Sequence, residues 1–289
     1  MALHGLIPNM NLLNIGCGDT FHTDWINLDV ASTSPDVRVH DTRQGIPYLE
    51  QSFDACYSSH MLEHLNKEGA KIFLSECFRI LKSKGIVRIV VPDLEAIVRA
   101  YLSALEQVED GALEAIQDYD WMMLELYDQV VRNKSGGEMA RYLQRADLTN
   151  RAFIRSRIGF EVEKYWHSSL GTQQQDKRQP IWYLTESKLL PALVQKIRLK
   201  ISRLLVAWIA GEQVCQTFEE SLFLNSGEIH RWMYDRVSLR RLLEESGFVE
   251  VTVCRANESR IPDFDRYALD MIGNEIRKPD SLFMEAIKP

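Results

Sequence analysis

The sequence predicts an α/β protein in which a mostly parallel sheet carries a large helical insertion. Short apolar segments alternate with helical patterns over residues 11–93, and residues 94–203 are mainly helical in character. A helix and two strands then return near the end of the chain. Alternation of this kind favours a parallel sheet with helices on its faces.

The first half of the predicted sheet follows from local patterns. Strands are expected at NLLNIG (11–16), WINLDV (25–30), DVRVHD (36–41) and SFDACYSSH (52–60). A helix is expected over residues 69–85, because apolar side chains recur there at helical spacing and Gly85 can end it. IVRIVVPD (86–93) is almost continuously apolar, which is typical of a buried parallel strand.

The second half gives the domain organisation. SLRRLLEESG (238–247) predicts a helix, and FVEVTVCRA (248–256) and SLFMEAIKP (281–289) predict strands. We therefore expect one α/β domain from residues 1–93 and 226–289, with residues 94–225 as a helical lid that binds the acceptor. Within the lid, QQQDKRQP (173–180) is expected to form a surface loop. LLVAWIA (204–210) is too short to cross a membrane and is expected to be a buried helix rather than a membrane-surface contact.

Composition limits the classes of partner. The net charge is −7, but residues 132–203 carry a balance of +9, which leaves −16 for the rest of the chain. The basic middle either attracts a phosphorylated or otherwise anionic partner or is a solvated surface. Nucleic acid is disfavoured by the acidic total. Five scattered cysteines without a CxxC pair, and a first segment unlike a signal peptide, lead us to expect a cytoplasmic protein without membrane insertion.

A glycine turn and two acids indicate a nucleotide-like cofactor. Gly16-Cys17-Gly18 follows the first strand, where glycine lets the backbone turn tightly and approach a ligand. Asp29 ends the second strand, where an acid can accept hydrogen bonds from ribose hydroxyls. Asp41 and Thr42 end the third strand, where a carboxylate can accept from an adenine amine. Only eleven positions separate Gly18 from Asp29, which leaves little room for the helix that holds a dinucleotide pyrophosphate.

The fourth strand runs into His60-Met-Leu-Glu63-His64, which has the H-x-x-E-H form of a reversed zincin motif. Such a motif holds zinc when it lies well inside a helix. Here it opens directly after a buried strand. We therefore predict no metal site.

These segments together resemble class I S-adenosylmethionine-dependent methyltransferases, in particular bacterial type 11 methyltransferases associated with glycan or surface-polysaccharide biosynthesis. The resemblance covers residues 1–95 and 230–289, and its pieces are LLNIGCG, INLD, HDTRQGIPYLEQSFDACYSSHMLEHL, ECFRILKSKGIVRIVVPDLE, YDRVSLRRLLEESGFVEVTV and SLFMEAIKP. It implies a Rossmann-like fold with a mostly parallel seven-stranded sheet and an antiparallel last strand. It also implies S-adenosylmethionine as the cofactor. Because this cofactor has no phosphate, it can do without a long first helix.

The resemblance also implies cofactor contacts by position. The glycine turn would lie against the methionine part of the cofactor, and the end of the second strand would lie under the ribose. The end of the third strand would lie beside adenine, and the end of the fourth would lie along the sulfonium. The implied residues are Gly16, Cys17, Gly18, Asp29, Asp41, Thr42, Ser58, Ser59 and His60. The chain departs from the pattern in lacking a third glycine and most of the first helix, which leaves the contacts of residues 20–25 open.

The expected reaction is in-line methyl transfer to an oxygen, or a nitrogen, of a small polar acceptor that is sugar-containing or phosphorylated. A hydroxyl acceptor needs a base, and histidine suits that role near neutral pH. The candidate bases are His230, His64 and His60. The candidate acceptor contacts are Arg231, Trp232, Tyr234, Glu138, Arg141 and Arg157, although each can instead be a packing or solvent-facing residue.

Two other functions stay open. A nicotinamide-dependent sugar enzyme would carry GxGxxG and a YxxxK pair, and neither is present. The domain could also be a non-catalytic module that binds the cofactor or a partner. Assembly into a homo-oligomer also stays open.

Overall fold

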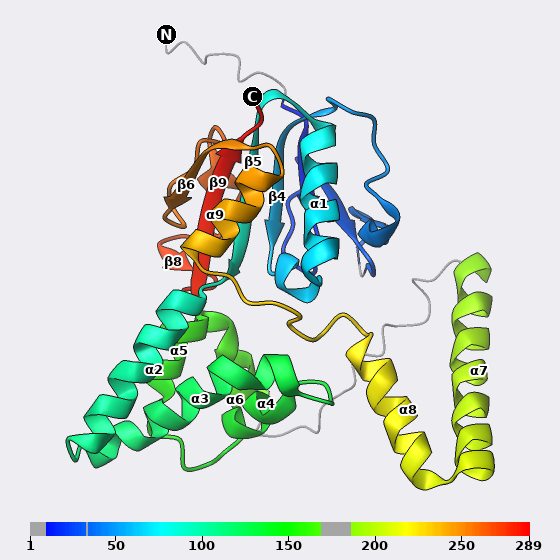
Figure 1. The fold of residues 1–289 in the computed structure, drawn as a ribbon, viewed down its shortest axis with the longest axis vertical. Coiled ribbons are helices and arrows are strands. Elements are labelled where there is room, and N and C mark those ends of the chain that lie inside the picture. Colours follow the sequence, from blue (N-terminus) through cyan, green and yellow to red (C-terminus); the bar gives the residue numbers. More distant parts are fainter. Residues whose placement is uncertain (1–9, 33, 169–185) are drawn as a thin grey trace. The chain divides into compact units, whose positions relative to one another are not determined.

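The computed structural model describes residues 10–32, 34–168 and 186–289 (Figure 1). Its contacts divide the chain into two compact units, which we describe separately. The first comprises residues 1–122, 150–162 and 230–289, and the second comprises residues 123–149 and 163–229. The helical segment predicted at 94–225 is thus shared between them, so a separate lid domain stays a prediction.

The first unit is built on a seven-stranded sheet. Its strands are β1 (Leu12–Ile15), β2 (Ile26–Asp29), β3 (Val37–Val39), β4 (Phe53–Ser59), β5 (Leu81–Pro92), β6 (Val249–Cys254) and β9 (Ser281–Ile287). They lie in the order β3-β2-β1-β4-β5-β9-β6. The first five are parallel, and β9 runs antiparallel to both β5 and β6. This arrangement confirms the predicted Rossmann-like methyltransferase fold.

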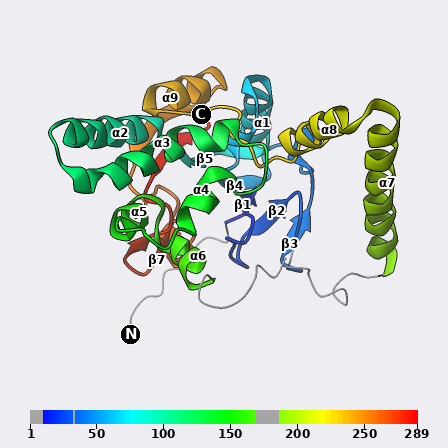
Figure 2. The same ribbon diagram turned by 90° about the horizontal axis from the view of Figure 1, so that it is seen from below.

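Two helices cover one face of this sheet, α1 (Lys67–Ile80) and α9 (Arg236–Glu245) (Figures 1 and 2). Asn66 caps α1 by accepting a hydrogen bond from the backbone N–H of Gly69, and Asp235 with Ser238 forms a capping box at α9. The apolar sides of both helices share one buried core with the strands.

The prediction that Gly85 ends the first helix is wrong. The helix ends at Ile80, and the chain enters β5 at Leu81 without a loop. Gly85 lies inside β5, where an added Cβ would stand 2.8 Å from the carbonyl oxygen of Lys82. The pairing register of β4 and β5 shifts here. Gly85 therefore fits a crowded, irregular stretch of the strand and does not end a helix.

The other face of the sheet is covered differently. Within the described part of the chain no helix joins β1 to β2, as the spacing predicted. Trp25, Tyr57, Phe264 and Tyr267 form a buried aromatic cluster there, with ring centroids 5.3–6.4 Å apart in edge-on or tilted pairs. The last two of these residues belong to the long loop that follows β6.

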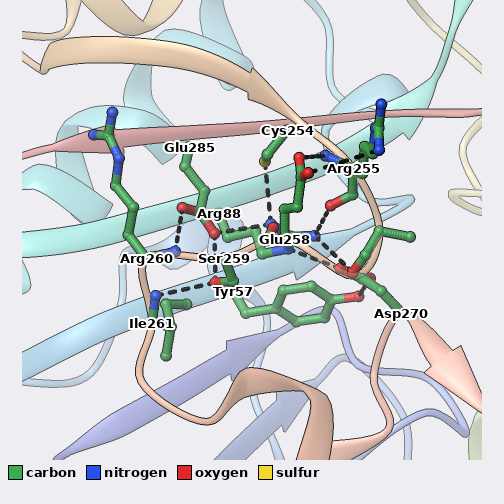
Figure 3. Close-up of polar contacts among 11 residues, drawn as sticks. Tyr57, Arg88, Cys254, Arg255, Glu258, Ser259, Arg260, Ile261, Asp270 and Glu285 are labelled. Carbon is green, nitrogen blue, oxygen red and sulfur yellow. Dashed lines mark hydrogen bonds and ion pairs between the residues drawn. The ribbon is translucent and has the colours of Figure 1, made fainter.

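A buried arginine fastens this loop to the sheet (Figure 3). Arg88 of β5 is fully buried, and its Nε donates to Asp270 Oδ2 at 2.7 Å while Nη1 donates to Glu285 Oε1 at 2.8 Å. Further bonds from the same guanidinium reach the backbone carbonyls of Arg255, Ala256 and Glu258.

Both carboxylates hold additional groups of the first unit. Glu285 accepts from the hydroxyl of Ser259 at 2.6 Å and the backbone N–H of Arg260 at 2.8 Å. Asp270 accepts from the hydroxyl of Tyr57. Burial, followed by the charge of Asp270, raises the pKa of Tyr57 well above its usual value, so this hydroxyl remains a donor.

The other elements lie outside the sheet. In the first unit these are α2 (Leu94–Glu109), α5 (Arg151–Ile158), η1 (Thr42–Gln44), η2 (Leu62–His64), η3 (Leu113–Ala115), η4 (Phe160–Val162), η6 (Phe264–Tyr267) and the small pair β7 (Met271–Ile272) and β8 (Glu275–Ile276). The helix α3 (Ile116–Val131) passes from the first unit into the second. The second unit holds α4 (Gly137–Leu143), α6 (Glu163–Ser168), α7 (Glu186–Ala210) and α8 (Glu212–Leu224).

The prediction of a buried helix at residues 204–210 is wrong. Leu204 is 71% exposed and Trp208 is 84% exposed. Among the described elements, α7 packs chiefly on α8, which covers only one side of it. In the described part of the chain no helix is long and apolar enough to span a bilayer. The loop predicted at residues 173–180 lies outside the described residues.

We predict that Arg88→Leu lowers the free energy of unfolding by about 3–5 kcal/mol, because it leaves the carboxylates of Asp270 and Glu285 buried without their counter-charge. Urea unfolding followed by circular dichroism measures the change. The control is Arg99→Leu, which removes an exposed ion pair with Glu95 and is expected to cost less than about 1 kcal/mol. Equal losses in the two variants would contradict the central role of Arg88.

Candidate active site

A cavity of about 280 Å³ lies in the first unit, at the carboxyl ends of β1 and β4. The turn after β1 and the end of β4 form one side. The segment from Leu269 to Phe283, together with Glu161, forms the other. Its lining residues are Asn14, Gly16, Cys17, Gly18, Asp19, Thr20, Tyr57, Ser59, His60, Val90, Glu161, Leu269, Asp270, Arg277, Lys278 and Phe283. Ligands of open α/β sheets bind at this edge.

The glycine turn is held to β2 by backbone bonds. Gly16 has φ +70°, and its N–H donates to the carbonyl oxygen of Leu28 at 2.8 Å. A Cβ at this position would lie 2.7 Å from Met61, so only glycine fits. Gly18 has φ +51° with open space where its Cβ would be, and its N–H donates to Asp29 Oδ2 at 2.8 Å. Asp29 therefore ties the turn to the end of β2, although it does not line the cavity itself.

The predicted adenine contacts lie next to β3 and do not line the cavity either. Asp41 caps η1, and both of its carboxylate oxygens bind the guanidinium of Arg43 at 2.8 Å. This bidentate hydrogen bonding lowers the pKa of Asp41. Thr42 is the first residue of η1. An adenine amine would have to share Asp41 with Arg43.

The end of β4 brings one candidate histidine to the cavity. Ser58 is buried, and Ser59 and His60 line the cavity. His60 adopts a left-handed backbone conformation with φ +51°. Its Nε2 lies 2.7 Å from Ser281 Oγ, and its Nδ1 lies 3.3 Å from Glu63 Oε1. Burial lowers the pKa of His60 well below its usual value, which keeps the ring neutral.

The other two candidate histidines lie together beside a buried acid. The rings of His64 and His230 are edge to face, with centroids 4.9 Å apart. Their ligand atoms and those of Glu63 all lie within 4.8 Å of one another. Burial raises the pKa of Glu63 to about 8. Neither histidine of this pair lines the cavity.

The predicted acceptor residues are dispersed. Trp232 and Tyr234 line a second pocket of about 210 Å³ together with Lys67, whose Nζ lies 3.8 Å from the centroid of the Trp232 ring. Lys71, Ser238, Arg241, Leu242 and Glu245 complete that pocket. Arg231 is exposed, and Arg157 is half-buried in α5. Glu138 and Arg141 belong to the second unit, where they form an exposed ion pair at 2.8 Å.

Sequence patterns did not predict the charged wall of the cavity. Glu161 and Arg277 form an ion pair at 3.3 Å, and Asp270 and Lys278 lie beside them in the lining. Burial lowers the pKa of Lys278, although the carboxylates of Glu63 and Asp280 oppose this effect. These residues sit in segments without a regular period. The only sequence signal for these wall residues was the high density of charged residues near the end of the chain.

This lining fits the chemistry of S-adenosylmethionine. The cofactor carries a sulfonium and an ammonium, which carboxylates can attract, and a carboxylate, which Arg277 or Lys278 can pair. Gly18 leaves open space beside the cavity where a side chain would otherwise stand. Asp29 keeps carboxylate lone pairs for ribose hydroxyls, since Gly18 and Ala31 donate to only part of its capacity.

Comparison with known proteins gives one family match. Residues 13–89 match the model of a methyltransferase domain. No curated protein sequence matches the chain. The match covers β1 to most of β5 and includes the glycine turn, Asp29 and the end of β4.

Several solved structures are similar to this chain at low sequence identity and low TM-score. A S-adenosylmethionine-dependent methyltransferase from Archaeoglobus fulgidus is 12% identical, with a TM-score of 0.38 over 96% of this chain and 86% of that chain. A methyltransferase from Mesorhizobium loti is 16% identical, with a TM-score of 0.25 over 32% and 50%. The [4+2]-cyclase SpnF is 21% identical, with a TM-score of 0.24 over 28% and 38%. The chain thus spans half or less of the last two proteins.

The last strand of the chain, β9, lies antiparallel between β5 and β6. The glycine turn follows β1, and Asp29, eleven residues after Gly18, ends β2. Residues 13–89 therefore match a methyltransferase domain within a sheet of the class I strand order, and S-adenosylmethionine is the cofactor.

Proposed function

We propose that this protein transfers a methyl group from S-adenosylmethionine to an oxygen of a small, polar, sugar-containing acceptor, with a nitrogen acceptor as the alternative. The observation that supports this best is the position of His60, whose imidazole lies in the wall of the cavity that the glycine turn also lines. The cofactor supplies a methyl group that is already activated by its sulfonium. The protein then has to position the acceptor and receive its proton.

His60 is the proposed proton acceptor, since of the three candidate histidines it alone lines the cavity. Its Nε2, which now lies 2.7 Å from Ser281 Oγ, would exchange that partner for the acceptor hydroxyl. The acceptor oxygen would bond to the methyl carbon as the S–CH₃ bond breaks, and the hydroxyl proton would pass to the imidazole. S-adenosylhomocysteine and the methylated acceptor are then the products.

The charged wall supports a polar acceptor. Asp270 and Glu161 carry oxygens that can accept bonds from sugar hydroxyls, and Arg277 and Lys278 carry donors suited to a phosphate. The acceptor contacts predicted at Arg231, Trp232 and Tyr234 of the first unit, and at Glu138 and Arg141 of the second, each stay a separate prediction. A role in cytoplasmic glycan biosynthesis is proposed on the resemblance alone.

We predict that Asp29→Ala weakens S-adenosylmethionine binding at least about tenfold, because a charged hydrogen-bond acceptor contributes about 1.5–3 kcal/mol. Its loss also frees the N–H of Gly18 from the turn. Titration calorimetry measures the change, and the exposed Asp110→Ala is the matched control. S-adenosylmethionine binding that is indifferent to Asp29, or tight binding of NAD by the unaltered protein, would overturn the cofactor assignment.

We predict that His60→Asn lowers kcat by about 10²–10⁴-fold, the contribution of a general base. Asparagine is chosen because it tolerates the left-handed backbone of His60. Transfer of a radiolabelled methyl group to a panel of sugar nucleotides measures kcat, with His22→Ala as the control. Turnover that is unchanged in His60→Asn, His64→Ala and His230→Ala would remove the proposal of a histidine base.

A further inference from the structure

Three side chains with metal-ligating atoms lie close together but do not line the cavity. Glu63 and His64 come from η2, directly after β4, and His230 comes from the segment that leads to α9. Their ligand atoms lie within 4.8 Å of one another. Backbone bonds hold the two segments together, since the N–H groups of Arg231 and Trp232 donate to the carbonyl oxygen of Glu63 at 2.7 and 3.2 Å.

The carboxylate of Glu63 is the unusual member of this group. Its side chain is 0% exposed, and neither of its oxygens accepts a hydrogen bond from the described residues. Burying a carboxylate without such bonds costs several kcal/mol unless a cation compensates it. One imidazole nitrogen, His60 Nδ1, lies 3.3 Å from Oε1. Two more imidazoles, those of His64 and His230, lie beside the same carboxylate.

We propose that Glu63, His64 and His230 bind a divalent transition-metal cation of the zinc class. Two imidazoles and one carboxylate form the donor set of catalytic zinc sites and of other sites that keep a coordination position open. The inference does not depend on the proposed methyl transfer, because metal binding is measurable without an acceptor. Because Glu63 contacts His60, the ion would also help to hold His60 at the wall of the cavity.

The local geometry suits this ion after small side-chain adjustments. Ligand atoms about 2.0–2.2 Å from zinc lie about 3.3–3.6 Å apart in a tetrahedron. The present separations reach 4.8 Å, so side-chain rotation would have to shorten them on metal binding. The edge-to-face imidazoles can turn one nitrogen each towards a common point.

Two further groups can support the ion without binding it. His60 contacts Glu63 through Nδ1 and Ser281 through Nε2, so it would orient the ligating carboxylate. The hydroxyl of Tyr234 is buried, finds no hydrogen-bond partner among the described residues, and lies within electrostatic reach of Glu63. It could bond to a water in the open coordination position.

Another cation also acts on this acid. The ammonium of Lys278 interacts electrostatically with Glu63, yet it also interacts with Asp280, Glu161 and Asp270. If Lys278 alone balanced Glu63, the two histidines would have no part in it, and replacing them would leave metal content unchanged. The test below separates these two arrangements.

The experiment is metal analysis of the full-length protein. After dialysis against a chelator, the chain is titrated with Co²⁺, whose visible d–d absorption reports a site with nitrogen and oxygen ligands, and Zn²⁺ is then added as competitor. We expect about one equivalent of metal per chain, displaced by Zn²⁺. We expect at least about 100-fold weaker binding in Glu63→Gln, His64→Ala and His230→Ala. We expect about 10–100-fold weaker binding in His60→Asn, the usual effect of losing a side chain that orients a metal ligand.

Controls separate metal loss from misfolding. His22→Ala removes a histidine outside the cluster and is expected to bind metal as the unaltered chain does. Glu63→Gln is nearly isosteric, and S-adenosylmethionine binding by the Glu63, His64 and His230 variants reports that their fold is intact. Circular dichroism reports the fold of His60→Asn, because His60 lines the cofactor cavity. Absence of saturable Co²⁺ binding, or binding that persists in Glu63→Gln and His230→Ala, would overturn the metal site. Absence of S-adenosylmethionine binding by the unaltered chain would overturn the proposed function instead.

Discussion

The buried guanidinium of Arg88 is the constraint on which the first unit depends. Both apolar faces of this sheet are covered. The helices α1 and α9 cover one face, and the irregular loop after β6 covers the other. An irregular loop has backbone carbonyls that no ladder satisfies. Arg88 provides donors for three of them and for two carboxylates at once. The hydrogen bonds of this one charged side chain thereby satisfy loop carbonyls that a helix would satisfy with its own backbone N–H groups.

The same network determines the shape of the cavity. Asp270 is held by Arg88 on one oxygen and by Tyr57 on the other, and both Asp270 and Tyr57 line the cavity. The stability of the sheet face and the position of the charged wall therefore have one cause. A change that loosened Arg88 would alter the acceptor side of the cavity, even though Arg88 does not line it.

Local patterns predicted the strands, the turn after β1, the absent first helix and the sheet class, because each depends on neighbours within a few residues. They could not predict Arg88, which stands inside the apolar run IVRIVVP and finds Asp270 182 residues away. They misplaced the end of α1, because Gly85 signals a helix stop equally well when it serves a strand irregularity. They also predicted burial at residues 204–210 from hydrophobicity alone, whereas burial depends on which partner covers α7.

The histidine motif shows most clearly how backbone conformation decides chemistry. In a helix, H-x-x-E-H places two histidines on one face, one turn apart. Here His60 is left-handed at the end of β4, and only Leu62–His64 forms a short 3-10 turn. The two histidines of the motif therefore diverge. His60 turns to the cavity, while His64 joins Glu63 and finds its second imidazole in His230, 166 positions further along the chain. We expected no metal because the motif is not helical. The same non-helical backbone lets Glu63 and His64 lie beside His230.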